Sequence, residues 1–116
     1  MKELDEDYEK KYTIQETALK ELVKGDKTCI VSDSITVGGA KVGHMYREEP
    51  YFEEDSGWRF FAGDESPDYV DNEKNLDIFE LNVIANHDTA IVKYLEKKQG
   101  AELERIADSD DFKPVE

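Results

Sequence analysis

Cysteines, bases and long apolar runs are scarce in this chain of 116 residues. The single cysteine, Cys29, cannot form an internal disulfide, and its apolar neighbours predict a small buried side chain. No segment approaches the roughly eighteen apolar residues of a membrane-spanning helix, and the opening MKELDEDYEKKYT has no apolar signal core. We therefore expect a protein that stays in the cytoplasm of the cell that makes it.

The shortage of bases gives the chain a large negative charge. It has 15 Lys and Arg residues against 29 Asp and Glu residues, a formal net charge of −14. Such a chain repels phosphate backbones and anionic lipid, so we expect no direct binding to nucleic acid or membrane. The acids either simply keep the protein soluble or form a surface for a basic partner. Twelve aromatic residues (one Trp, six Tyr and five Phe) argue against intrinsic disorder.

The order of apolar residues predicts one α+β domain over residues 13–107, between a charged lead-in at 1–12 and a loose acidic tail at 108–116. Thr13–Lys24 has a capping box and apolar residues at helical spacing, which predict an amphipathic helix that Gly25 ends. Alternating and β-branched residues predict three strands and a short edge strand, at Thr28–Ser32, Lys41–Arg47, Trp58–Ala62 and Leu76–Phe79.

Two short helices are predicted in the second half, in ELNVIAN and DTAIVKYLEK, with Asp88 as the N-cap of the second. AELERI, residues 101–106, fits either a final strand or a helical turn. The strands at Lys41–Arg47 and Trp58–Ala62 are expected to pair as a hairpin. Together these elements predict a small antiparallel sheet packed against helices on one side.

No motif indicates a metal or catalytic site. DESPDYVDNEKN, residues 64–75, spaces oxygen donors faintly like a calcium loop, but Tyr69 replaces the glycine that the turn needs and Asn75 replaces the bidentate glutamate. His44, His87 and Cys29 lack zinc-ligand spacing. No nucleophile elbow, phosphate-binding loop or dinucleotide fingerprint is present. We therefore expect no cofactor, no metal and no catalytic residues.

The strongest signal is an acidic, aromatic stretch between Glu48 and Glu73. It holds ten acids and one base, Arg59, which is a net −9 of the −14. Trp58 and Phe60 are expected in the core, and Arg59 is expected to pair with nearby carboxylates. Aromatic anchors among steering acids suit an interface for a basic protein. The predicted interface consists of Tyr51 and Phe52 as anchors, Arg59, and the acids Glu48, Glu49, Glu53, Glu54, Asp55, Asp64, Glu65 and Asp68.

Several segments resemble one bacterial family, long catalogued as a domain of unknown function and classed as immunity protein family thirty-three of polymorphic-toxin systems. They are VSD at 31–33, KVGHMYREEP at 41–50, DSGWRFFAGDE at 55–65, DN at 71–72 and LNVIAN at 81–86. The resemblance covers about Cys29–Arg105. It implies a non-enzymatic cytosolic protein that binds and blocks a cognate toxin, and it brings no catalytic residues.

The kind of toxin and the class of protein both stay open at this point. A nuclease toxin has a basic groove that an acidic protein can occupy by mimicking phosphate charge, but toxins of other kinds fit the resemblance as well. We expect a monomer or a weak homodimer, because an exposed edge strand permits pairing. The alternatives are a small-molecule-binding module with an apolar pocket near Trp58, a regulatory or housekeeping domain, and an enzyme with polar groups converging in a cleft.

Overall fold

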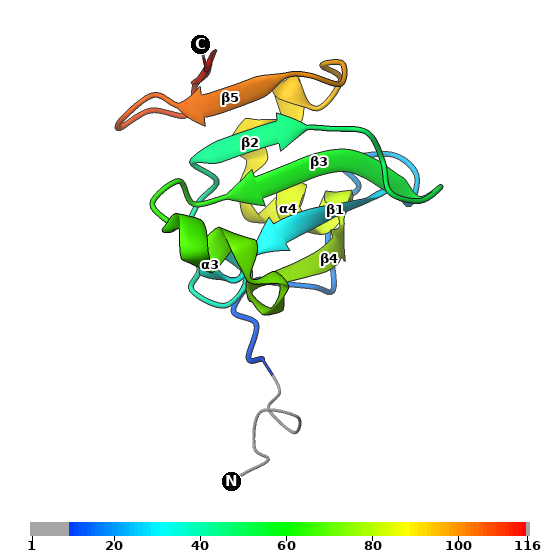
Figure 1. Ribbon diagram of the computed structural model, residues 1–116. Coiled ribbons are helices and arrows are strands. Elements are labelled where there is room, and N and C mark those ends of the chain that lie inside the picture. Colours follow the sequence, from blue (N-terminus) through cyan, green and yellow to red (C-terminus); the bar gives the residue numbers. More distant parts are fainter. Residues whose placement is uncertain (1–9, 116) are drawn as a thin grey trace, which may run out of the picture.

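The strands form one mixed sheet in the order β4-β1-β3-β2-β5-β6 (Figure 1). The computed structural model describes residues 10–115. The strands are β1 Thr28–Ser32, β2 His44–Arg47, β3 Asp55–Phe61, β4 Leu76–Glu80, β5 Glu102–Arg105 and β6 Phe112–Pro114. The helices are α2 Asp33–Thr36, α3 Pro67–Asp71 and α4 Leu81–His87, with 3₁₀ helices η1 Glu73–Asn75 and η2 Thr89–Tyr94. The α+β class is as predicted.

Most predicted elements are found close to their predicted bounds. The first strand matches in full, and AELERI forms a strand, the first of its two alternatives. Strands β2 and β3 pair antiparallel, as the predicted hairpin requires, and β4 lies at the edge of the sheet. Asp88 caps η2, since its carboxylate accepts a hydrogen bond from the Ala90 N–H.

The sheet is mixed, so the prediction of a purely antiparallel sheet is wrong. β1 pairs antiparallel with β4 but parallel with β3. The chain reverses direction from β1 to β2 and again from β2 to β3, so β1 and β3 run the same way. In the sheet β3 lies between β1 and β2, so the parallel strands β1 and β3 are direct neighbours.

The predicted helix over Thr13–Lys24 is also wrong. This segment is irregular, with Ala18 at φ 57, and its backbone is held by asparagines of α4 instead. The Asn82 side-chain oxygen accepts from Leu22 N at 2.8 Å and Val23 N at 2.9 Å, and Asn86 does the same for Lys20 N at 3.1 Å. A helix of about twelve residues is only marginally stable alone, so these hydrogen bonds from α4 determine the conformation of the segment.

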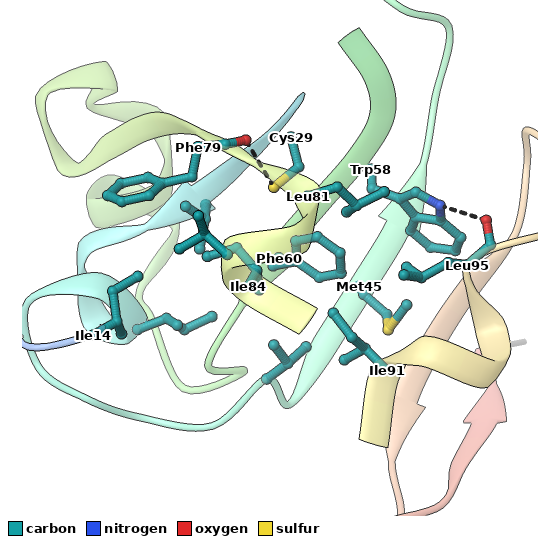
Figure 2. Close-up of a cluster of buried hydrophobic side chains, with 14 of the residues drawn as sticks. Ile14, Cys29, Met45, Trp58, Phe60, Phe79, Leu81, Ile84, Ile91 and Leu95 are labelled. Atoms are coloured by element: carbon teal, nitrogen blue, oxygen red, sulfur yellow. Dashed lines mark hydrogen bonds between the residues drawn. The ribbon is translucent and has the colours of Figure 1, made fainter. Parts of the chain in front are cut away.

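The core lies between the sheet and the segment α4–η2 (Figures 1 and 2). Trp58 and Phe60 are fully buried and stacked with ring centroids 6.0 Å apart, which confirms their predicted core position. Trp58 Nε1 donates to the Leu95 carbonyl at 3.1 Å, so the indole links the sheet to the end of η2. No helix among residues 10–115 is long and apolar enough to cross a membrane.

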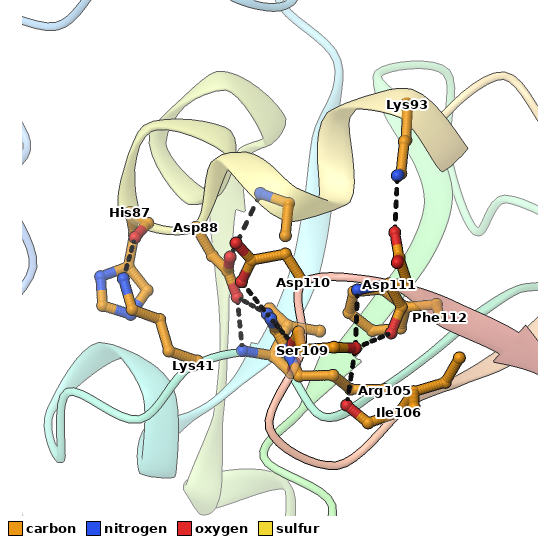
Figure 3. A network of polar contacts seen from close by, with 12 residues as sticks. Lys41, His87, Asp88, Lys93, Arg105, Ile106, Ser109, Asp110, Asp111 and Phe112 are labelled. Atoms are coloured by element: carbon orange, nitrogen blue, oxygen red, sulfur yellow. Dashed lines mark hydrogen bonds and ion pairs between the residues drawn. The ribbon is translucent and has the colours of Figure 1, made fainter.

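The tail is partly ordered, so the prediction of a loose tail is wrong for Phe112–Pro114, which pair with β5 as β6. Figure 3 shows the polar network beside this pair of strands. The Arg105 guanidinium pairs with the buried Asp88 carboxylate, donates to the Val42 carbonyl at 2.8 Å and contacts Asp110. This one side chain therefore ties the β5–β6 edge to the start of η2.

Cys29 lies in the core, as predicted, with its thiol 3.5 Å from the Phe79 carbonyl. Burial raises the pKa of this thiol far above its ordinary value, so the reactive thiolate is absent from the native protein. We expect Cys29 to resist a chromogenic disulfide reagent in native buffer and to react fully in urea. Reaction in native buffer at the rate of free cysteine would contradict the buried position.

Candidate functional site

The loop Glu48–Glu54 connects β2 to β3 and is held against the sheet by Arg59. The Tyr51 ring stacks on the Arg59 guanidinium, whose carbon lies 4.6 Å from the ring centroid. Glu48 accepts two hydrogen bonds with one carboxylate oxygen, at 2.6 Å from Arg59 Nε and at 3.0 Å from the Tyr51 hydroxyl. Glu48 and Tyr51 belong to the loop and Arg59 belongs to β3, so these contacts hold the first half of the loop against the sheet.

A second carboxylate completes the pairing of Arg59. Asp55 receives two guanidinium hydrogen bonds, of 2.9 Å and 2.8 Å, in the bidentate geometry that arginine favours. Its oxygens also accept the backbone N–H groups of Tyr51 at 2.8 Å and Gly57 at 2.9 Å. Asp55 and Arg59 are each only 2% exposed. The expectation that Arg59 pairs with nearby carboxylates is confirmed.

Both members of this buried pair are charged at neutral pH. Burial alone would raise the pKa of Asp55, but hydrogen bonds from Arg59 and from the N–H groups of Tyr51 and Gly57 outweigh it and lower the pKa to about 2. Burial would lower the pKa of Arg59, but its hydrogen bonds with Asp55 and Glu48 hold that pKa above its ordinary value. The ionised and hydrogen-bonded Asp55–Arg59 pair thus attaches the loop to the sheet.

A family comparison assigns the chain. The family model described as Immunity protein Imm33 domain matches residues 29–116. The chain belongs to the Imm33 family. The family resemblance seen in the sequence is confirmed, and the match extends past Arg105 to the end of the chain. No curated protein and no solved structure matches the chain.

In this Imm33 domain the predicted interface residues differ in exposure. Asp55 and Arg59 are buried, whereas Glu48 and Glu65 are partly buried. Tyr51 is 68% exposed despite its contact with Arg59. The exposed members are Glu49, Tyr51, Phe52, Glu53, Glu54, Asp64 and Asp68.

The structure places the exposed members in two groups rather than one. The loop Glu48–Glu54 precedes β3, whereas Asp64, Glu65 and Asp68 follow it (Figure 1). β3 has seven residues, which at about 3.3 Å each span roughly 20 Å. Glu65 also folds back to accept the N–H groups of Ala62 at 2.8 Å and Gly63 at 2.9 Å. The loop before β3 is therefore the better candidate for a single contact surface.

Among residues 10–115 no three or more His, Cys, Asp or Glu side chains are placed to hold a metal ion. Oxygens of the calcium-like segment have local roles: Ser66 accepts from Tyr69 N and Asn72 from Lys74 N, each capping a helix. His44 Nε2 lies 2.8 Å from Glu102 Oε2, and His87 Nε2 lies 2.8 Å from the Ala40 carbonyl. These groups stabilise local structure.

Sequence reasoning missed the apolar residues that lie beside this loop on the open face of the sheet. Ile78 of β4 is 55% exposed and pairs in register with Ile30 of β1. The alternation in LDIFE, residues 76–80, was a usable signal, since Phe79 and Ile78 must face opposite sides of the sheet. The sequence did not show which of the two faces outward, or that Tyr51 lies nearby.

Proposed function

We propose that this Imm33 protein is a non-enzymatic cytoplasmic inhibitor that binds a cognate bacterial toxin through the loop Glu48–Glu54. The proposal is supported by family membership and by one structural observation. The Glu48–Arg59–Asp55 network fixes a loop that exposes two large aromatic side chains, Tyr51 and Phe52, next to exposed acids. A loop held in one conformation before binding loses little conformational entropy on binding.

The acids of the loop favour a partner with a basic surface. Glu49, Glu53 and Glu54 are exposed and belong to a protein of net charge −14. They steer a basic surface toward the loop, where the aromatic side chains supply apolar contact. A toxin that acts on nucleic acid presents such a basic surface in its substrate groove, and this Imm33 protein then blocks the groove by occupying it.

The small-molecule alternative gains no support from Trp58. The expected pocket required an indole at a cavity wall, whereas Trp58 is fully buried, stacked on Phe60 and hydrogen-bonded to Leu95. Its position is explained by the core alone.

Charge reversal tests the proposal. The double substitution Glu53→Lys with Glu54→Lys is expected to weaken binding to the cognate toxin by at least about 10-fold and to reduce protection of co-expressing cells. Calorimetry at two salt concentrations measures the affinity, and the wild-type affinity is expected to fall as salt rises.

The matched control is Glu16→Lys with Glu21→Lys, which changes the net charge equally at two exposed acids outside the matched region. This control is expected to bind within about 2-fold of wild type. Equal affinities for the loop variant and wild type would contradict the assignment of the loop, and no toxin binding by wild type would contradict the proposed function.

A further inference from the structure

The face of the sheet opposite α4 carries large apolar and aromatic side chains. Side chains alternate along each strand, so Ile30, Tyr46 and Arg59 lie opposite to the buried Val31, Met45 and Phe60. Tyr46 stacks on Phe61 with ring centroids 6.0 Å apart and an interplanar angle of 8°. In Figure 1 this face is turned toward the viewer and α4 lies behind the sheet. Phe61 and Arg59 are buried and Ile30 and Tyr46 are half-buried, so the apolar surface that stays exposed on this side lies at Ile78 of β4 and Tyr51 of the loop.

A groove crosses this face between the loop and the edge strand. Its volume is about 570 Å³, and it is lined by Ile30, Tyr51, Glu73, Leu76, Asp77 and Ile78. Arg59 holds the Tyr51 ring at one wall, while register with Ile30 fixes Ile78 at the other. Two of the most exposed large apolar side chains of residues 10–115, Tyr51 and Ile78, thus face the same groove.

We propose that this groove receives a basic segment of the toxin, with one large apolar side chain inserted between Tyr51 and Ile78 and a lysine or arginine beside it. The inference rests on the proposed function, because it takes the partner to be the toxin. The lining contains two acids, Glu73 and Asp77, and no base. Asp77 lies opposite the buried Val31 and two residues from Phe79, so its side chain is directed to the α4 side of the sheet. Asp77 Oδ2 already accepts from Lys10 at 2.9 Å and Tyr12 at 2.6 Å, so we assign Glu73 to the partner's base.

Charge also selects against the other occupants. A second copy of this chain brings a further net charge of −14 toward an acidic groove. The first nine residues of the chain, MKELDEDYE, contain five acids and one lysine and are repelled in the same way. A basic partner is the occupant that gains from both the acids and the apolar walls.

Peptide selection tests the groove without a known toxin. A random peptide library displayed on phage is selected on the immobilised full chain, and enriched peptides are titrated against wild type, Ile78→Lys and Ile106→Lys. Ile106 is the matched control, because it is 41% exposed and follows β5, near the edge of the sheet opposite to β4. Lysine is well tolerated on exposed edge strands, and thermal unfolding checks that both variants fold.

We expect enriched peptides to combine lysine or arginine with a leucine or an aromatic residue. They should bind Ile106→Lys within about 2-fold of wild type and Ile78→Lys at least about 10-fold more weakly. Neutral or acidic peptides, or peptides that bind Ile78→Lys as tightly as wild type, would overturn the proposal. So would a wild-type dimer in sedimentation that Ile78→Lys dissociates, because the groove then receives a second copy.

Toxin binding by the variants distinguishes the groove proposal from the proposed function. Loss of toxin affinity in Ile78→Lys, with affinity retained in Ile106→Lys, supports both. Toxin binding that is equal in wild type and Ile78→Lys would overturn the groove and leave the proposed function intact. A wild-type chain that selects basic apolar peptides but binds no toxin would overturn the proposed function and leave a basic-peptide site at the groove.

Discussion

Replacing Arg59 with alanine is expected to lower the free energy of unfolding by about 3–5 kcal/mol at pH 7, as measured by urea denaturation. The substitution leaves the Asp55 carboxylate, which is 2% exposed, without its bidentate partner. Asp55 is ionised in the wild-type protein because its pKa is about 2, so a full buried charge loses its compensation. The cost arises mainly from this uncompensated charge rather than from the loss of a favourable ion pair.

The pH dependence of the unfolding free energy tests whether the buried Asp55 charge causes this loss. In wild type the pKa of Asp55 is lower when folded than when unfolded, so its contribution is present above about pH 4 and is lost as the pH falls toward about 2. In Arg59→Ala the buried Asp55 carboxyl loses its two hydrogen bonds from the guanidinium, so its pKa in the folded state rises. The variant therefore gains stability as the pH falls. We therefore expect the difference between wild type and variant to shrink from pH 7 to pH 4.

The control for this prediction is Lys93→Ala. Lys93 pairs with Asp111 at 2.8 Å, but the two side chains are 62% and 63% exposed, so solvent screens the pair and the expected loss is far smaller than that of Arg59→Ala. An Arg59→Ala loss as small as that of Lys93→Ala, or one that is independent of pH, would show that the buried pair does not stabilise the protein.

Local patterns in the sequence were sufficient to predict the central strands. TCIVS is β-branched and apolar and forms β1 at its predicted bounds, and the aromatic alternation of Trp58 and Phe60 places both in the core. The apolar pattern of Thr13–Lys24 predicted an amphipathic helix, and the segment does contact the core but is not helical. Ile14 is buried, yet Asn82 and Asn86, about sixty residues away in sequence, supply the hydrogen bonds that a helix would have supplied itself.

The candidate site was predictable from the sequence only in part. Arg59 is the one base of the acidic stretch and was expected to pair with nearby carboxylates, but the sequence did not single out Asp55, because four residues of regular strand span about 13 Å. The two side chains meet because β3 is irregular between them, with Gly57 at φ 89 and a shifted register to β1. Asp64 and Asp68 share an acidic window with the loop, but the length of β3 separates them from it. The groove wall at Ile78 depends on the order β4-β1-β3, and a sequence without known strand pairing does not give this order.

Replacing Gly57 with alanine is expected to cost about 3 kcal/mol, combining a left-handed backbone with steric overlap. Gly57 has φ 89, and a Cβ there would lie 2.2 Å from the Glu48 carbonyl oxygen. That oxygen belongs to the backbone at the start of the loop and cannot rotate away, so the loop must move. Movement of Glu48 breaks its contacts with Arg59 and Tyr51, and we therefore expect toxin affinity to fall along with stability.

Gly100→Ala separates the two contributions to this cost. Gly100 has φ 98, close to that of Gly57, but a Cβ there meets nothing within 4 Å. Its replacement therefore has only the backbone cost, about 1–2 kcal/mol, and leaves the loop in place. The difference between the two variants in urea denaturation measures the steric term, and only Gly57→Ala is expected to weaken toxin binding. Equal stabilities would mean that the approach of β3 to Glu48 does not fix the loop, and that Arg59 alone holds Tyr51 at the groove.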